Sequence, residues 1–303
     1  MSRIHDALKK AEQERAEIQT SAVQPGFSVV PPAGTAGLRE ESSVTGGDGA
    51  GAAFYASLGL ESLLAKSSQA QWNPDPATML FLNGDDNKRG TEEFRTLRSR
   101  LYNAREKMPL KSVLITSALP KEGKSFTSAN LAQVLVRQHG RRVLLIDADL
   151  RAPRLHLMLG TTSSPGLSDY LQGRSDEFSI MQRGPLENLY FIPSGTPIDD
   201  PSELVGNGRL KILLQRVGLL FDWIIVDSPP AVPVSDSGVL AKACDGVVIV
   251  VRSNSTPFDA ARKAREEFPD QSLVGMVLNG TRDGAAPYSR YYYEAYDKKR
   301  QES

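Results

Sequence analysis

A short apolar run that leads into a tight loop and then into a helix is the feature that most constrains the fold of this chain. Residues 113–125 read VLITSALPKEGKS, which places an expected strand before the loop and Lys124-Ser125 at the start of a helix. In this layout, backbone N–H groups and a helix N-terminus converge on an anion. Lys124 would reach the β- and γ-phosphates of a nucleotide, and the Ser125 hydroxyl would bind Mg²⁺. Ala118 stands where the pattern G-x-x-x-x-G-K-[ST] has its first glycine.

Two later apolar runs end in aspartate, which favours a nucleotide site over an empty strand–turn–helix junction. Residues 142–151 (RVLLIDADLR) contain Asp147 and Asp149, and residues 221–230 (FDWIIVDSPP) contain Asp227. Continuous apolar runs are typical of buried parallel strands, whose carboxyl ends line a ligand crevice. An acid at that place would hold Mg²⁺ or its waters. The alternative is that Asp147 and Asp227 only cap the helices that follow.

Strands and helices are expected to alternate through the rest of the chain. The predicted strands are Ser112–Ser117, Arg142–Asp147, Asn188–Pro193, Trp223–Asp227, Gly246–Arg252 and Leu273–Asn279. The predicted helices are Lys124–His139, Ser202–Val217, Ser235–Ala243 and Pro257–Phe268. This rhythm indicates βαβ units, and therefore an α/β fold of the P-loop NTPase type: a mostly parallel sheet with helices on both faces.

The composition divides the chain into four parts. Residues 1–19 hold a predicted amphipathic helix, for which docking to a partner, to a membrane surface or to the domain itself are all open. Residues 20–76 are expected to be a flexible linker, because Gly, Ala, Ser, Pro and Thr dominate its first half; a short helix is expected near 54–65. Residues 77–285 form the P-loop domain.

Residues 286–303 form a tyrosine-rich C-terminal tail, with a packed helix as the alternative. Five of the chain's nine tyrosines lie there: Tyr288, Tyr291, Tyr292, Tyr293 and Tyr296. They stand among polar residues without aliphatic neighbours, so their phenols are expected to face solvent and to be open to chemistry.

Charge and cysteine content narrow the class of protein. The formal net charge is zero, so no nucleic-acid partner is expected. The one cysteine, Cys244, excludes an internal disulfide framework, and the first residues lack the apolar core of a signal peptide. The apolar runs are far shorter than the ~20 residues that cross a bilayer. We therefore expect a cytoplasmic protein.

These features together resemble the bacterial tyrosine kinases of exopolysaccharide and capsule export, the BY-kinases. The likeness runs from about residue 92 to residue 280, with 117–125 as the family's Walker A, 143–154 (VLLIDADLRAPR) as its Walker A′ and 221–230 as its Walker B. The family tolerates a residue other than glycine at the first loop position. The spacing Glu92-x-x-Arg95-x-x-Arg98 matches the family's E-x-x-R-x-x-R element, although on residues alone it is an ordinary solvated helix face.

The resemblance implies an ATP- and Mg²⁺-dependent protein-tyrosine kinase that phosphorylates its own tail tyrosines, in a ring-shaped homo-oligomer joined through Glu92, Arg95 and Arg98. The implied nucleotide-binding residues are Lys121, Glu122, Gly123, Lys124, Ser125 and Phe126, with Asn279 reading the adenine. The implied metal ligands are Ser125, Asp149 and Asp227. Asp147 would orient the incoming tyrosine hydroxyl or accept its proton, and it could exchange this part with Asp149.

The resemblance also implies partners. A separate membrane protein, the polysaccharide co-polymerase, would recruit the kinase to the inner face of the plasma membrane and activate it, and a tyrosine phosphatase would reset the tail. Two other functions compete. A partition or positioning ATPase of the ParA/MinD kind would carry a second lysine where Leu119 stands. A nucleotide-binding regulatory module would share the motifs and catalyse little.

Overall fold

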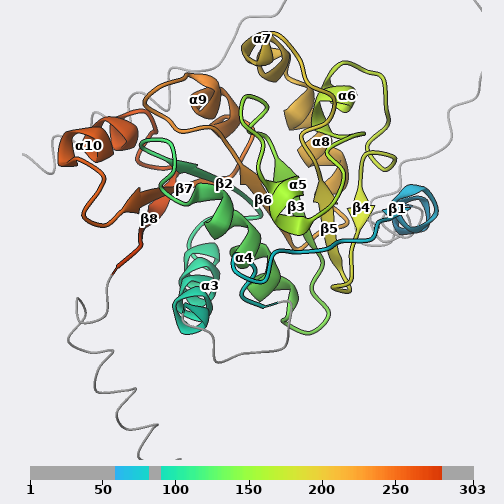
Figure 1. Cartoon of the computed structure of the whole chain (residues 1–303), viewed down its shortest axis with the longest axis horizontal. Helices are drawn as coiled ribbons and strands as arrows, with labels where there is room; N and C mark the ends of the chain where they lie inside the picture. The colour runs from blue at the N-terminus through green and yellow to red at the C-terminus, as the bar shows by residue number, and fades with distance from the viewer. Residues whose placement is uncertain (1–58, 82–89, 282–303) are drawn as a thin grey trace, which may run out of the picture. The chain divides into compact units, whose positions relative to one another are not determined.

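The computed structural model describes residues 59–81 and 90–281. The predicted helix at 3–19 and the tail tyrosines lie outside these residues. One sheet runs through the described part in the order β1-β4-β5-β3-β6-β2-β7-β8 (Figure 1). Every neighbouring pair is parallel except β4 with β5. The strands are Ser68–Gln69 (β1), Ser112–Ser117 (β2), Val143–Asp147 (β3), Gln182–Arg183 (β4), Leu189–Ile192 (β5), Trp223–Asp227 (β6), Gly246–Arg252 (β7) and Leu273–Asn279 (β8). The predicted α/β fold is confirmed.

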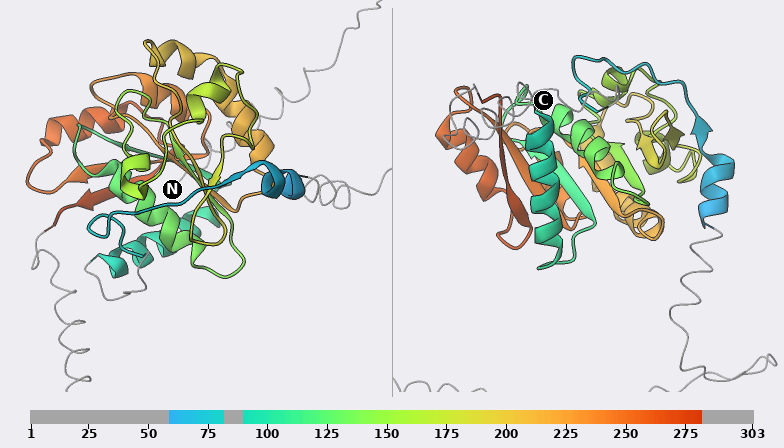
Figure 2. Two further views of the ribbon diagram at one scale, coloured as in Figure 1. Left: turned by 45° about the vertical axis from the view of Figure 1, so that its right-hand side comes forward. Right: turned by 90° about the horizontal axis from the view of Figure 1, so that it is seen from below.

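Helices cover both faces of this sheet (Figures 1 and 2). They are Thr91–Arg105 (α3), Lys124–Val136 (α4), Leu155–Leu159 (α5), Leu167–Leu171 (α6), Pro201–Gly206 (α7), Arg209–Val217 (α8), Asp236–Ala241 (α9) and Phe258–Glu266 (α10). Alternation along β2 explains the two layers, because successive side chains of a strand point to opposite faces. Val113 and Ile115 pack in the apolar cluster of α3 and α4, whereas Leu114 packs in the cluster of α6, α8 and α9. None of the helices in the described ranges has the length and apolar content needed to span a bilayer.

The main difference from the predicted helices lies at residues 207 and 208. One helix was predicted over Ser202–Val217, but Gly208 adopts φ +79° and separates α7 from α8. Gly208 begins α8 in the left-handed region that glycine occupies at low cost. The short elements β4, α5 and α6 carry too few residues to show a period in the sequence.

The linker predicted over residues 20–76 extends too far. Residues 59–66 are helical, and β1 pairs parallel with β4. Leu63 and Met79 are fully buried, and Trp72 meets Phe191 edge to face at 6.2 Å between ring centres. The large apolar side chains of Leu63, Trp72, Met79 and Phe81 each fill a place in the core. Residues 67–81 therefore form an N-terminal strap over the domain (blue in Figure 2).

The strap should contribute strongly to stability, which Trp72→Ala would reveal. Trp72 is 9% exposed and lies so close to Gly184 that a Cβ there would be 2.3 Å from the indole ring. Truncating a buried tryptophan costs about 3–5 kcal/mol. We expect urea unfolding to show a loss of this size for Trp72→Ala. Leu64→Ala, in the helix at 59–66 that precedes the strap and 47% exposed, should change stability by less than about 0.5 kcal/mol. Equal losses from both variants would contradict a packed strap.

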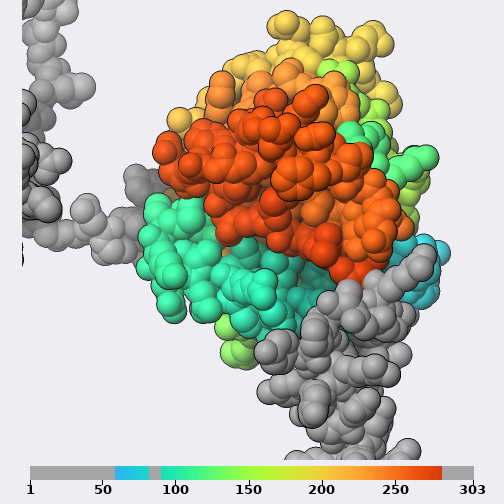
Figure 3. Space-filling model, turned by 90° about the vertical axis from the view of Figure 1, so that its left-hand side faces the viewer, coloured from blue at the N-terminus to red at the C-terminus, as the bar shows by residue number. Residues whose placement is uncertain are grey.

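Strand β8 forms one edge of the sheet, and its end leads to the tail. Met276 and Leu278 on β8 are 45% and 58% exposed. In the space-filling view the residues of α10 and β8, in orange to red, lie above α3 (Figure 3). Gly280 follows β8 with φ +69°. Because β8 runs parallel to β7 and β7 parallel to β2, the C-terminal end of β8 lies at the same end of the sheet as the loop before α4.

Candidate active site

The loop between β2 and α4 is bent by two left-handed residues. Lys121 has φ +66° and Gly123 has φ +96°, and α4 starts directly afterwards at Lys124. A side chain is excluded at Gly123, because a Cβ would lie 2.0 Å from the amide nitrogen of Asn279. The tight turn and the helix start leave the backbone N–H groups of the loop in the arrangement of an anion cradle.

The strand-end acids meet this loop. Asp147 on β3 and Asp227 on β6 are direct neighbours in the sheet register, and both are fully buried. Lys124 Nζ lies 2.9 Å from Asp149 Oδ2. Asp227 accepts hydrogen bonds from Ser125 Oγ at 2.6 Å and from Ser128 Oγ at 2.9 Å.

The structure thus brings together every strand-end acid, Lys124 and Ser125 as the sequence predicted. Ser128 was missed, although its position one turn after Lys124 places it on the same face of α4.

The alternative that the two aspartates only cap the helices that follow holds for Asp147 but not for Asp227. The carboxyl group of Asp147 accepts from the backbone N–H groups of Asp149 at 3.3 Å, Arg154 at 3.2 Å and Leu155 at 3.1 Å, at the start of α5. Asp227 is held by the two serine hydroxyls of α4 instead. Asp147 therefore shapes the chain around Asp149, whatever further part it has in chemistry.

Burial sets the protonation of these groups. Burial raises the pKa of Asp227 to about 6, although Lys124 and the serine hydroxyls favour its ionised form. Burial and the neighbouring charge of Asp227 raise the pKa of Asp147 well above its ordinary value, against the backbone N–H donors of Leu155 and Asp149. For Lys124, burial lowers the pKa, but the charges of Asp227 and Asp149 outweigh it, and the pKa lies above its usual value. The ammonium is therefore firmly charged.

The oxygen atoms of this site suit Mg²⁺. Mg²⁺ is usually held by one or two carboxylates, several waters and the substrate phosphates. Ser125 Oγ and Asp227 Oδ2 adjoin each other beneath the loop, with Asp149 opposite Lys124. Among the residues described here, no three His, Cys, Asp or Glu side chains form a ready metal cage. The donor set fits a cation that arrives with a nucleotide.

The raised pKa of Asp227 predicts opposite pH effects on binding and on stability. Because only the ionised carboxylate attracts a cation, the Kd for MgATP should rise as the pH falls below about 6, approaching tenfold per pH unit. In the ligand-free protein, the raised pKa makes the folded state bind the proton more tightly, so this group adds stability as the pH falls from above 6 towards 4. Calorimetric titration of MgATP and urea unfolding between about pH 8 and pH 5 check the two directions.

Nucleotide phosphates also titrate near 6, so the binding series needs a control. In Asp227→Asn the carboxyl group is replaced by an amide, and only the nucleotide's own pH dependence should remain. An identical slope for the variant and the wild type would show that Asp227 does not titrate in this range.

Three other predicted site residues, Glu122, Phe126 and Asn279, make contacts within the protein at or beside the loop. The Glu122 side chain turns inward and is 3% exposed. Phe126 packs edge to face on Phe94 of α3, with ring centres 5.9 Å apart. Asn279 donates from Nδ2 to the Glu122 carbonyl oxygen at 2.8 Å, so its amide contacts the loop. These contacts are structural in the ligand-free chain, and none of them was foreseen.

The residues predicted as a subunit contact lie on α3. Glu92 and Arg95 form an ion pair, and Arg98 Nη1 donates to the Val134 carbonyl oxygen of α4 at 3.0 Å. Arg98 therefore also joins α3 to α4 within one chain.

A further network was not predicted from the sequence. Arg151, two residues after Asp149, contacts the carboxylate of Asp236 on α9 through Nε at 2.7 Å and the Ser202 hydroxyl on α7 at 2.6 Å. Asp236 is 2% exposed, and Ser202 Oγ also donates to it at 2.9 Å. This network fixes the start of α7 and of α9 beside the loop that carries Asp149.

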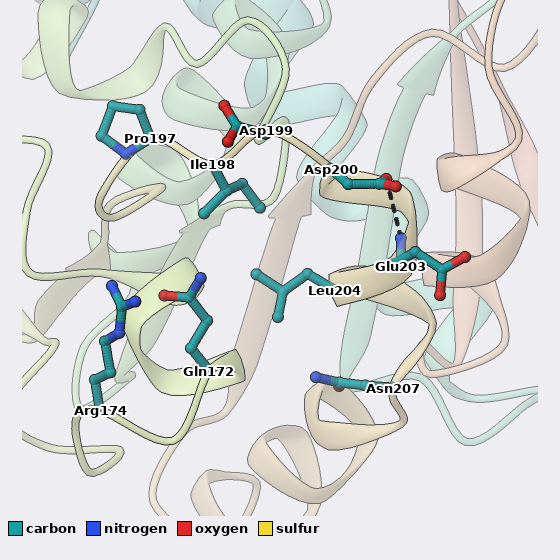
Figure 4. Close-up of a pocket in the computed structure, with 9 residues that line it drawn as sticks. All are labelled: Gln172, Arg174, Pro197, Ile198, Asp199, Asp200, Glu203, Leu204 and Asn207. Atoms are coloured by element: carbon teal, nitrogen blue, oxygen red, sulfur yellow. Dashed lines mark hydrogen bonds between the residues drawn. The ribbon is translucent and has the colours of Figure 1, made fainter.

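An open pocket of about 500 Å³ lies beyond this network, between α6 and α7 (Figure 4). Asp200 there accepts a hydrogen bond from the Glu203 backbone N–H, which begins α7. The lining residues are Gln172, Arg174, Pro197, Ile198, Asp199, Asp200, Glu203, Leu204 and Asn207. Since no residue of the 118–125 loop lines it, this pocket is separate from the phosphate cradle.

Comparison with known proteins decides the family. Residues 121–261 match a family model described as "AAA domain". The chain is 36% identical over 205 residues to tyrosine-protein kinase YwqD of Bacillus subtilis, covering 67% of this chain and 85% of that protein. The chain belongs to the bacterial tyrosine kinases. Tyrosine-protein kinase CpsD of Streptococcus agalactiae is 33% identical over 221 residues, covering 70% of this chain and 93% of CpsD.

The solved structures agree. The kinase domain of the Escherichia coli tyrosine kinase ETK superposes with a TM-score of 0.62 at 26% identity, covering 74% of this chain and 93% of that domain. This bacterial tyrosine kinase is therefore a P-loop enzyme, and the cluster of Lys124, Asp149 and Asp227 lies where its nucleotide loop meets its strand-end acids.

Proposed function

We propose that this bacterial tyrosine kinase transfers the γ-phosphoryl group of ATP, in the presence of Mg²⁺, to tyrosines of its own C-terminal tail. The observation that carries the proposal is the buried ion pair of Lys124 with Asp149, beside Asp227 and Ser125. The tyrosine oxygen attacks the γ-phosphorus, the bond from that phosphorus to the β-γ bridging oxygen breaks, and ADP leaves with the electron pair. The tyrosine proton passes to a carboxylate.

Each residue has a part that its position supports. Lys124 and the backbone amides from Lys121 to Ser125 hold the phosphates, and the side chains of Ser125, Asp149 and Asp227 would hold Mg²⁺, which neutralises charge on the transferring group. Asp147 or Asp149 accepts the proton of the tyrosine hydroxyl; the two carboxyl groups lie at or just after the end of β3, and Asp149 contacts Lys124. Asn279 lies beside the loop, where it could also contact the adenine.

The wider role follows from the resemblance to BY-kinases. The kinase phosphorylates the tail of a neighbouring subunit in a ring and regulates exopolysaccharide polymerisation and export. A separate membrane co-polymerase recruits it to the inner face of the plasma membrane, and a tyrosine phosphatase removes the phosphates.

Phosphotyrosine on the purified protein after incubation with MgATP tests the proposal. A partition or positioning ATPase would release phosphate from ATP and carry no phosphotyrosine. A regulatory module would bind nucleotide and do neither. Either result would overturn the proposed autokinase activity.

The proposed ring predicts that Arg95→Ala combined with Arg98→Ala yields smaller species by light scattering. Exposed ion pairs contribute only about 0–1 kcal/mol each, so the effect requires an interface that partly buries α3. Because Arg98 also binds Val134 within the chain, circular dichroism must show that the double variant is folded. Arg100→Ala, on an exposed position of the same helix, is the matched control. If the folded double variant forms an oligomer of unchanged size, these residues are an ordinary solvated helix face and not a subunit contact.

A further inference from the structure

An acidic side chain is buried inside the phosphate-binding loop. Glu122 is 3% exposed, whereas its neighbour Lys121 is exposed. One carboxylate oxygen accepts from the Leu119 backbone N–H at 2.7 Å, and the other accepts from the Thr256 hydroxyl. Burying a carboxylate without partners is costly, so the loop can hold Glu122 inward only while both contacts are made.

Thr256 is fixed by the turn that follows β7. Its hydroxyl oxygen accepts from the Arg252 backbone N–H at 2.7 Å, which leaves the hydroxyl proton to point at Glu122. The Thr256 backbone N–H in turn donates to the Arg252 carbonyl oxygen at 3.0 Å. The turn is therefore closed on itself, and Thr256 meets the loop as a rigid donor.

Asn279 completes the contact from the end of β8. Its Nδ2 donates to the Glu122 carbonyl oxygen at 2.8 Å, and its own carbonyl oxygen accepts from the Ser253 N–H at 2.8 Å. The absent side chain of Gly123 leaves the space that this amide occupies. The ends of β7 and β8 are thus joined to each other and to one residue of the loop.

We propose that Thr256 and Asn279 are positioning residues that act through Glu122 to hold the phosphate-binding loop in its nucleotide-ready shape. The loop contains two left-handed residues, one of them the non-glycine Lys121, and such backbone persists only where surrounding contacts fix it. A loop ordered in advance loses less entropy when the phosphates bind. Arg252 adds a longer contact, from Nη1 to the Lys121 carbonyl oxygen at 3.3 Å.

The inference rests on the proposed use of this loop for ATP, so the test reads nucleotide binding directly. A fluorescent ATP analogue is titrated with Mg²⁺ into the full chain and into Thr256→Val, which keeps the shape and removes the hydroxyl. We expect Kd to rise about tenfold, the effect of losing one hydrogen bond to a charged acceptor. KM for MgATP should rise similarly, while kcat at saturating MgATP changes by less than about threefold.

Three further variants separate positioning from general stability. Thr256→Ser keeps the hydroxyl and should bind within about twofold of wild type. Thr161→Val removes a hydroxyl bonded at 2.7 Å to Gln182, away from the loop, and should leave Kd unchanged. In a Glu122→Ala background, Thr256→Val should add almost nothing, because residues that act through one another are not additive.

The outcomes are distinct. Equal binding by Thr256→Val and wild type overturns the inference alone, as does a full tenfold effect of Thr256→Val in the Glu122→Ala background. A wild-type chain that does not bind the analogue would overturn the proposed function, and the inference with it.

Discussion

Replacing Lys124 with methionine should abolish ATP-dependent tyrosine phosphorylation in a chain that still folds. The Lys124 ammonium lies 2.9 Å from Asp149, and the neighbouring carboxylates raise its pKa, which keeps it charged. Phosphoryl transfer depends on positioning and on stabilising charge around the transferring group. Removing one such preorganised charged donor commonly costs about 10²–10³ in rate. We expect phosphotyrosine to fall at least that far, measured by radiolabel transfer or by phosphotyrosine antibody.

The same change affects stability, and this must be measured beside activity. Removing one partner of a buried ion pair costs about 3–5 kcal/mol when the other charge stays unpaired. The urea midpoint of Lys124→Met should therefore fall while the unfolding transition stays cooperative. Lys211→Met, at an exposed position on α8, makes the same chemical change away from the site and should leave both readouts near wild type. Normal labelling of folded Lys124→Met would remove Lys124 from the mechanism.

A mixing experiment should show that one subunit phosphorylates the tail of another. About nine residues separate the end of β8 from Tyr288, enough to extend roughly 30 Å. A tail of that reach could enter a neighbour's site in a ring, where the local concentration is high. We mix Lys124→Met carrying an intact tail with active protein whose five tail tyrosines are phenylalanine. The inactive partner's tail should become labelled.

Two controls make this result decisive. Each protein alone should remain unlabelled, and a size measurement must show that mixed oligomers form. If they form and the inactive partner's tail gains no phosphotyrosine where wild type labels fully, transfer between subunits is wrong. Each phosphate adds nearly two negative charges, so labelled tails should leave the acidic site, and oligomers should become smaller after labelling.

The central part of the fold was predictable because its signals are local. The runs at β2, β3 and β6 are mainly apolar and buried on both faces, and the acids that end two of them mark the crevice. The strap was not predictable. Trp72 and Met79 are separated by polar and proline residues, and only the tertiary structure shows that each fills a place in the core.

Some residues of the site could likewise be predicted from the sequence, and others could not. Lys124, Ser125 and the strand-end acids follow from motif and strand order, and Ser128 could have followed from helical spacing. The contact of Glu122 with Thr256 joins residues 134 positions apart and has no sequence pattern. Asp147 was expected to serve the chemistry, and its three N–H donors show a structural part that depends on where α5 starts.

The pairing of Lys124 with Asp149 has a consequence for which ligands the ligand-free site accepts. One ammonium stands among three buried carboxyl groups, those of Asp147, Asp149 and Asp227. A polyanion entering alone would draw Lys124 from its partner and deepen the excess of negative charge. A divalent cation that accompanies it supplies the missing counter-charge, so the favourable route is joint entry of the two. We therefore expect the ligand-free site to bind the metal complex of a nucleotide more tightly than bare phosphate compounds.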